Sequence, residues 1–241
     1  IIIHKEMIVL SNIIAYGGMP SKNSPSFSEE SFLLADKAKF IDGIMVDAYL
    51  TSDNKVVLSD EYLLMNMGID KEYINCASYN DILSINSGSK IKRNHLVLLD
   101  KLNEYCNPDT IVLINIIGCG CKNSDVINYI KNFVSKSNMN IYLYSKSKDI
   151  TETLLESDIN AKIGVKVTNK ASWNYSFDFY VVDTFWVNQE EIAKKLSDGC
   201  EIFVGIINNS DEVNKLKLEL GSSFSNCYLV SKSPSVIKNY L

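Results

Sequence analysis

Few side chains in this sequence have the types and spacing that enzyme chemistry requires. The 241 residues include two histidines, His4 and His95, and two closely spaced thiols, Cys119 and Cys121. Histidine exchanges protons readily near neutral pH, because its reference pKa is about 6.5. However, His4 precedes the first expected strand and His95 opens a helical segment, so we expect surface or packing roles for both. The cysteines lack a second pair or a nearby histidine, which favours structural thiols over a metal or redox site.

Two acids and one lysine are further candidates for chemistry. Asp47 and Asp60 each lie at an expected strand or its end and could form an acid pair, although Asp60 could instead make only a local hydrogen bond. Lys166 follows an expected strand and is the clear candidate for the lysine chemistry of an isomerase or aldolase. Trp173 and Trp186 could form pocket walls, with packing as the default role.

Composition narrows the classes of partner. Hydrophobic residues make up 46% and charged residues 22% of the chain, which is typical of a globular protein with a full core. The net charge is −5 and no basic run is concentrated, so we expect no nucleic-acid partner. No segment reaches the roughly 18 to 20 apolar residues of a membrane span. The six scattered cysteines favour reduced thiols and a cytoplasmic location.

The elements that must position these residues alternate along the chain. Short apolar runs predict strands at 12–16, 43–49, 111–117, 141–144, 161–165, 177–182, 201–206 and 227–230. Amphipathic patterns predict helices at 28–39, 95–105, 124–135, 150–157, 190–197, 210–220 and 235–241. Such alternation is typical of a parallel α/β sheet, either closed or doubly wound. Eight strands favour one closed barrel domain over residues 1–241, and the absence of a glycine-rich phosphate loop disfavours a dinucleotide-binding fold.

Local signals refine this outline. Asp53-Asn54 predicts a hairpin turn between strand 43–49 and a short strand at 55–58. Ser28, followed by Ser31 instead of an acid, provides only half of a capping box. Segments 63–83 and 84–94 fit the repeat poorly, and we expect them to form a loop excursion near the top of the barrel.

The N-terminal third carries a longer set of motifs. Tyr16-Gly17-Gly18 ends a strand, Pro25-Ser26-Phe27-Ser28 opens a helix, and residues 42–60 contain Asp-Gly-Ile-Met-Val-Asp, Leu-Thr-Ser-Asp-Asn and Val-Val-Leu-Ser-Asp. This order and spacing resemble the glycerophosphodiester phosphodiesterase family. There, His-Arg-Gly, Pro-Glu-Asn-Thr, Ile-Glu-x-Asp, Leu-Thr-Lys-Asp-Gly and His-Asp occupy the same positions. Weaker matches at 113–117, 205–208 and 230–234 extend the resemblance over nearly the whole chain, and it implies a (β/α)₈ TIM barrel of the PLC-like phosphodiesterase type.

The resemblance also implies a chemistry whose residues are replaced here. Family members hydrolyse glycerol phosphodiesters with two histidines, and those catalytic positions hold Tyr16 and Ser59 in this chain. A phenol with a pKa near ~10 is a poor base at neutral pH, and a serine hydroxyl is a poorer one. The adjacent arginine position is Gly17, which removes a bidentate contact to phosphate.

The metal site that the resemblance implies is replaced as well. In the family, two glutamates and an aspartate hold Mg²⁺ or Ca²⁺. Here their positions hold Met45, Asp47 and Ile117, or Asn115 in place of Ile117 if the register slips. One carboxylate with a thioether and an aliphatic neighbour makes a poor site for a hard cation. We therefore expect no metal and no other cofactor.

Two functions remain open. The first is a non-hydrolytic barrel that binds a small phosphorylated or polar ligand, or a protein partner. The second is an active phosphodiesterase or related phosphate-ester enzyme of lipid, glycerol-phosphate or surface-polysaccharide metabolism that uses rearranged residues. The candidate ligand-binding residues are Tyr16, Met45, Asp47, Ser59, Asp60 and Asn115. Either a cleft remains above them, or Met45 and Tyr16 fill it.

Overall fold

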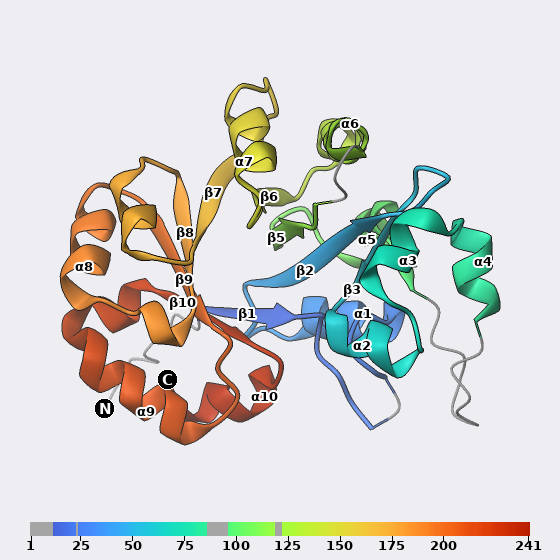
Figure 1. The fold of residues 1–241 in the computed structure, drawn as a ribbon. Coiled ribbons are helices and arrows are strands. Elements are labelled where there is room, and N and C mark those ends of the chain that lie inside the picture. The colour runs from blue at the N-terminus through green and yellow to red at the C-terminus, as the bar shows by residue number, and fades with distance from the viewer. Residues whose placement is uncertain (1–11, 23, 86–95, 119–121) are drawn as a thin grey trace.

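Eight parallel strands close into a barrel, as the resemblance implies (Figure 1). The structure is a computed structural model that describes residues 12–22, 24–85, 96–118 and 122–241. The barrel strands are β1 (Ile13–Tyr16), β2 (Gly43–Leu50), β5 (Ile111–Ile116), β6 (Asn140–Tyr144), β7 (Lys162–Val167), β8 (Phe179–Val182), β9 (Glu201–Gly205) and β10 (Tyr228–Ser231). Each strand pairs with the next in this order, and β10 pairs with β1, so no barrel edge is left open. The predicted (β/α)₈ barrel is confirmed.

Aromatic rings fill the amino-terminal half of the barrel. Side chains alternate between the two faces of a strand, so every second residue points inward. At the amino-terminal level these inward residues are Tyr142, Phe179, Phe203 and Tyr228, whose ring centroids lie 4.8 to 5.5 Å apart. Gly164 leaves room for them, because a Cβ atom there would lie 2.5 Å from the ring of Phe179. We call these four rings the aromatic plug.

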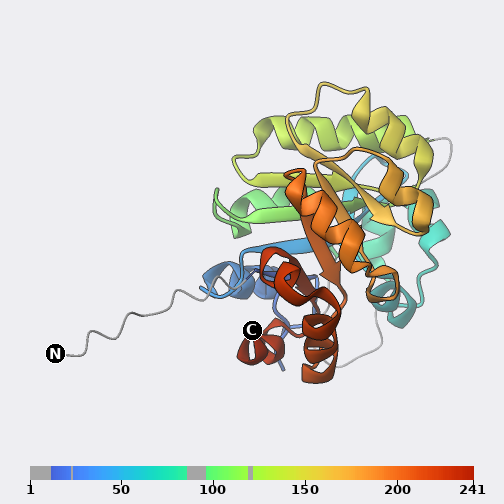
Figure 2. The ribbon, with the colours of Figure 1, turned by 90° about the vertical axis from the view of Figure 1, so that its left-hand side faces the viewer.

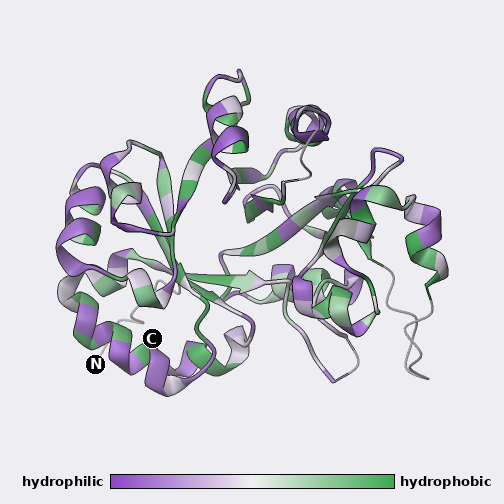
Figure 3. Ribbon diagram, in the orientation of Figure 1, coloured by the Kyte–Doolittle hydropathy of each residue, from purple (hydrophilic) through white to green (hydrophobic). Residues whose placement is uncertain are grey.

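Helices cover the outside of the barrel (Figure 2). Those that connect or follow barrel strands are α1 (Glu29–Lys37), α5 (Leu102–Tyr105), α6 (Asn123–Lys136), α7 (Lys148–Leu155), α8 (Gln189–Ser197), α9 (Ser210–Leu220) and α10 (Pro234–Ile237). Short 3₁₀ turns supplement them: η1 (Leu99–Lys101), η3 (Lys170–Asn174), η4 (Thr184–Trp186), η5 (Gly221–Asn226) and η6 (Lys238–Tyr240). Figure 3 shows the resulting distribution, with apolar residues along the strands and polar residues on the outer helices. This pattern explains why the strands read as apolar on both faces.

The predicted hairpin extends the sheet beyond the barrel. The second half of β2 pairs with antiparallel β3 (Val56–Ser59), and β3 pairs with β4 (Val97–Leu98). The turn between β2 and β3 places Asn54 at a φ of 56°, in the left-handed region that asparagine tolerates. The hairpin prediction is therefore confirmed.

The structure corrects two predictions for the segment after this hairpin. The expected excursion at 63–83 is present, but it forms three short helices, α2 (Glu61–Asn66), α3 (Lys71–Cys76) and α4 (Tyr79–Ser84), instead of a loop. Of the second expected segment, 84–94, residues 86–94 lie outside the described residues. Apolar side chains from α2 to α4 pack against Tyr49 and Val57 in a separate small core, which supplies the stability that such short helices lack alone. The expected helix at 95–105 instead begins as β4, because residues 97 and 98 pair with β3, and only its end is helical.

The start of α1 corrects a third prediction. Ser28 accepts a hydrogen bond from the backbone N–H of Ser31, and Ser31 Oγ accepts one from the backbone N–H of Ser28. The capping box is thus complete, since a serine hydroxyl serves in place of the usual carboxylate.

Some candidates of the sequence fall outside the described residues. His4, His95, Cys119 and Cys121 are among them, so the structure says nothing of their surroundings. Within the described ranges, no helix combines the length and apolar character needed to cross a membrane.

The aromatic plug makes a testable contribution to stability. Phe203 is fully buried in it, whereas Phe185 is 84% exposed on η4. We expect Phe203→Ala to reduce the free energy of unfolding by about 3 to 5 kcal/mol, because truncation leaves a cavity among packed rings. The matched control Phe185→Ala should change it by less than about 0.5 kcal/mol. Urea denaturation measures both values, and equal losses in the two variants would contradict the packing described here.

Candidate functional site

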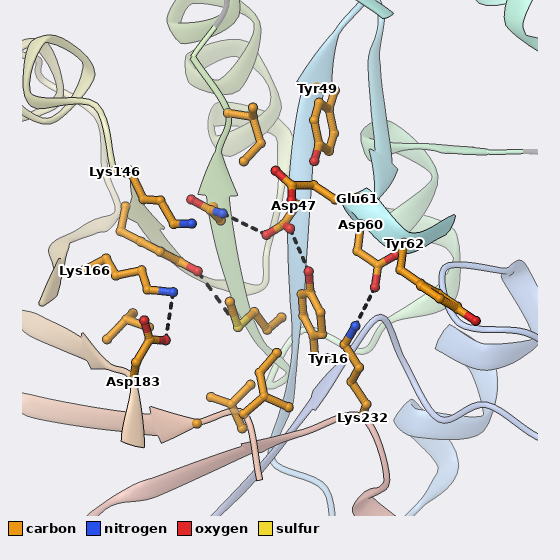
Figure 4. A pocket seen from close by; sticks show the side chains of 18 of the residues that line it. Tyr16, Asp47, Tyr49, Asp60, Glu61, Tyr62, Lys146, Lys166, Asp183 and Lys232 are labelled. Carbon is orange, nitrogen blue, oxygen red and sulfur yellow. Dashed lines mark hydrogen bonds and ion pairs between the residues drawn. The ribbon is translucent and has the colours of Figure 1, made fainter. Parts of the chain in front are cut away.

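A cavity of about 460 Å³ opens at the carboxyl ends of the barrel strands (Figure 4). All eight barrel strands, or the residues directly after them, contribute to its wall: Tyr16, Met45, Asp47, Asn115, Tyr144, Lys146, Lys166, Val181, Asp183, Gly205, Val230 and Lys232. Residues of α2 and neighbouring loops complete the rim, including Asp60, Glu61, Tyr62 and Met65. Inward-facing residues that lie above the aromatic plug meet here, because all barrel strands end at the same face. Of the two alternatives, the structure therefore has the open cleft.

Asp47 is the central polar group of the cavity. Its carboxylate accepts a hydrogen bond from Tyr16 Oη at 2.6 Å and another from Asn115 Nδ2 at 2.8 Å. The β2–β5 register sets Asn115 directly opposite Asp47, and Tyr16 ends the neighbouring strand β1. Only 8% of Asp47 is exposed. The carboxylate is thus buried, with both of its oxygens engaged by neighbouring side chains.

Burial changes the acidity of this group and of its partner. It raises the pKa of Asp47 above the ordinary value of 3.8, and the hydrogen bonds from Tyr16 and Asn115 act in the opposite direction. Burial also raises the pKa of the Tyr16 phenol well above its usual range, and the negative charge of Asp47 adds to this effect. Tyr16 therefore keeps its proton at neutral pH and serves as a hydrogen-bond donor.

The floor beside Asp47 contains two incompletely satisfied polar groups. Asn115 is 5% exposed, and its Oδ1 atom has no hydrogen-bond partner among the described residues. Tyr144, which lies opposite Asn115 in the β5–β6 register, donates a weak hydrogen bond to Met45 Sδ at 3.9 Å, and its hydroxyl has no second partner in the described part of the chain. Because buried polar atoms normally have partners, these two groups leave hydrogen-bonding capacity at the cavity floor.

Three lysines bring positive charge to the cavity. Lys232 Nζ lies 2.7 Å from Asp60 Oδ2 and 5.0 Å from the ring centre of Tyr16. Lys166 Nζ lies 2.8 Å from Asp183 Oδ1. Lys146 also lines the cavity (Figure 4). The rim therefore carries both positive and negative side chains, and two of its three lysines are paired with carboxylates.

The structure brings most of the predicted site residues together. Tyr16, Met45, Asp47, Asp60 and Asn115 all line the cavity. Asp60 in addition accepts the backbone N–H of Leu63 and so caps α2, which is the local hydrogen bond considered from the sequence.

Ser59 and Ile117 have different positions. Ser59 lies opposite Asp47 in the β2–β3 register, but it is fully buried, donates to the carbonyl of Asp60 and is not among the described residues that line the cavity. Ile117 follows β5, lines the cavity and also packs against the small core beside the barrel. Asn115 faces Asp47 directly and donates to its carboxylate, which is the position that the alternative register of the third metal position requires.

Sequence reasoning missed Lys146 and gave no role to Lys232. Both continue the inward alternation beyond the ends of their strands, Lys146 after Tyr144 and Lys232 after Val230. That alternation is the signal by which they could have been found. Lys166, proposed for aldolase-type chemistry, is paired with Asp183.

Gly17 occupies the arginine position in a conformation that excludes a side chain. Its φ is 71°, and a Cβ atom there would lie 2.6 Å from the ring of Phe27. Phe27 is 1% exposed, and its ring packs edge-on against Tyr16 at a centroid distance of 5.5 Å. The space next to Tyr16 is therefore filled by an apolar ring.

The residues present do not fit a divalent cation. Among the described residues, no three histidine, cysteine or carboxylate side chains gather in a group that could hold a metal. The central donors are one carboxylate already bound to two hydrogen-bond donors, one amide and the thioether of Met45. Mg²⁺ and Ca²⁺ require several hard oxygen ligands, which this set does not supply.

Comparison with known proteins identifies the fold. No protein-family model and no curated protein matches the sequence. Solved structures do match: a phosphodiesterase from Oleispira antarctica in complex with the product sn-glycerol-3-phosphate has a TM-score of 0.76, 13% identity, and coverage of 95% of this chain and 94% of that chain. A glycerophosphodiester phosphodiesterase from Parabacteroides distasonis has a TM-score of 0.72 at 11% identity, with coverages of 92% and 93%. A glycerophosphodiester phosphodiesterase from Thermotoga maritima has a TM-score of 0.69 at 19% identity, with coverage of 92% of this chain and 94% of that chain.

The chain has the fold of the glycerophosphodiester phosphodiesterases. The resemblance inferred from the sequence motifs is thereby confirmed at the level of the fold. In this phosphodiesterase fold the cavity over Asp47 lies at the face where barrel enzymes place their active sites.

The buried carboxylate gives a testable dependence of stability on pH. Because the pKa of folded Asp47 is raised above 3.8, the folded state loses stability as the pH rises from about 4 through the raised value. Asp47→Asn removes this loss and keeps the contact from Tyr16, while Asn115 can turn its unpaired oxygen toward the new amide. We expect the stability of Asp47→Asn relative to wild type to increase between pH 4 and pH 7, as measured by urea denaturation.

A second carboxylate provides a control of opposite sign. Asp81 is exposed, and hydrogen bonds from Ser78 lower its pKa. Its contribution is present above the ordinary pKa and lost as the pH falls, so Asp81→Asn should lose stability relative to wild type at pH 7 and not at low pH. A pH-independent difference for Asp47→Asn would contradict the burial of its charge.

Proposed function

We propose that this protein is a non-hydrolytic phosphodiesterase-like barrel that binds a small phosphorylated or polar ligand. The observation that supports this function most directly is the state of Asp47. The cavity above it is open, yet its carboxylate is held by Tyr16 and Asn115 in a set of donors that suits no divalent cation. The binding architecture of the fold is thus retained without the groups that perform its hydrolysis.

The acid–base chemistry of hydrolysis lacks suitable groups at this site. A phenol whose pKa is raised by burial is a weaker acid than free tyrosine, so Tyr16 is poorly suited to exchange a proton with a substrate at neutral pH. Ser59, at the second histidine position, is buried and hydrogen-bonded to the backbone. General acid–base catalysis alone typically accelerates a reaction by ~10² to 10⁴-fold, and catalytic groups act as a unit. Replacement of these groups therefore predicts a large loss of hydrolytic rate.

The lining of the cavity supports a polar ligand of modest size. Its volume of about 460 Å³ lies within the ordinary range of small-molecule sites, ~300 to 1,000 Å³. Tyr62 and Met65 supply apolar surface at the rim, while lysines and carboxylates supply charge. The Oleispira antarctica structure contains sn-glycerol-3-phosphate, and this compound is therefore the first ligand to test.

The cysteines support a cytoplasmic location for this protein. The four cysteines within the described ranges are free thiols, which supports a reducing compartment such as the cytoplasm. A role in lipid or glycerol-phosphate metabolism would suit a ligand of this class.

Hydrolysis is the decisive assay. We expect no detectable release of glycerol 3-phosphate from glycerophosphocholine with either Mg²⁺ or Ca²⁺ present, because the proton-transfer groups and the metal ligands are replaced. The Thermotoga maritima relative, assayed in parallel, provides a positive control. Metal-dependent turnover that disappears in Asp47→Ala would contradict the proposal and favour an active enzyme with rearranged residues.

Binding is tested separately. We expect sn-glycerol 3-phosphate, glycerophosphocholine or a sugar phosphate to raise the melting temperature of the protein in the presence of a chelator. If no compound of this panel stabilises the protein, the barrel is an interaction scaffold and the ligand-binding proposal fails.

A further inference from the structure

Among the described residues, Lys146 is the lysine of the cavity that has no ion-pair partner, and its charge acts on the Asp47 carboxylate only from beyond ion-pair distance. Lys166 and Lys232 are paired with Asp183 and Asp60 at 2.8 and 2.7 Å. Within the described ranges, no carboxylate lies within ion-pair distance of Lys146 and no hydrogen bond to its ammonium is present. In Figure 4 its side chain reaches into the cavity from the same side as Lys166.

Unsatisfied polar groups lie on the strands next to this lysine. Lys146 follows Tyr144 by two residues and continues the inward face of β6. Asn115 is the register partner of Tyr144 on β5, and its buried Oδ1 atom has no partner among the described residues. Within the described ranges, the Tyr144 hydroxyl makes a single hydrogen bond, the weak one to Met45 Sδ. Three groups therefore lie at the corner between β5 and β6. They are the Lys146 ammonium, which has no ion-pair partner among the described residues, the unbonded Asn115 Oδ1 atom and the weakly bonded Tyr144 hydroxyl.

We propose that the Lys146 ammonium holds the anionic group of the ligand at this β5–β6 corner, in place of a divalent cation. The inference rests on the proposed ligand-binding function and assigns that function a specific residue and ligand chemistry. The ligand carries an anionic group, such as a phosphate, and a hydroxyl that donates to Asn115 Oδ1.

The charges of the remaining wall support this assignment. The ion pairs of Lys166 and Lys232 cancel most of the field of those two cations, so neither offers an uncompensated charge to an anion. Asp47 would repel an anion at the floor, but the positive charge of Lys146 acts on this carboxylate. An anion between Lys146 and the floor is therefore attracted by a cation that has no ion-pair partner in the described part of the wall, and it needs no metal.

Calorimetric titration with sn-glycerol 3-phosphate tests the assignment. The wild-type protein should bind this probe with the same affinity in EDTA and in Mg²⁺. Lys146→Met should weaken binding by about tenfold or more, since a charge-assisted hydrogen bond is lost. Lys146→Arg should restore most of the affinity, because it keeps the charge.

Lys148 provides the matched control. It lies two residues further along, at the start of α7, with its side chain 80% exposed and paired with Glu152. Lys148→Met should bind as wild type does. Equal affinity of Lys146→Met and wild type, or wild-type binding that requires Mg²⁺, would overturn the inference and leave the proposed function standing. Failure of the wild-type protein to bind any of sn-glycerol 3-phosphate, glycerophosphocholine, a sugar phosphate and inorganic phosphate would overturn the two together.

Discussion

Closure of eight parallel strands is the constraint on which this structure depends. A closed barrel has a fixed interior, and every second residue of each strand must either fill that interior or line its open end. Here the aromatic plug fills the amino-terminal half, with Phe179 and Phe203 fully buried. The next inward residues, among them Tyr16, Asp47 and Asn115, therefore lie above the plug and line the cavity at the carboxyl-terminal face. The position of the cavity follows from packing, whereas its chemistry depends on which side chains occupy that level.

Much of the fold could be predicted from the sequence, because its signals are local. Apolar runs long enough to be buried on both faces marked all eight barrel strands, and the helical periodicity marked most of the outer helices. The segment between β3 and β5 could not be predicted in the same way. Its helices α2, α3 and α4 are stabilised by a small core that includes Tyr49 and Val57, and such distant contacts leave no periodic trace in the segment itself. Residues 97 and 98 became a strand for a similar reason, since their partner β3 lies far along the chain.

The site was predictable only where motif spacing was informative. The spacing placed Tyr16, Met45 and Asp47 correctly on the cavity wall. It could not show that the Asp47 carboxylate would be bound by two side-chain donors, since those contacts depend on strand register across the barrel. Lys146 was missed because it stands beyond the end of its strand, where an isolated lysine resembles any solvated surface residue.

The packing of Phe27 against Gly17 bears on how this chain could change over evolutionary time. The family that the motifs resemble has arginine at the position of Gly17, but here the left-handed backbone and the ring of Phe27 oppose any side chain there. Phe27 itself adopts a φ of 62°, which suits few residues other than glycine, so the conformation of the loop depends on the packing of this ring. Each single substitution toward the arginine would lower stability before it could improve chemistry. The loop thus constrains the substitutions open to this chain, because any side chain added at position 17 conflicts with both the backbone and the ring of Phe27.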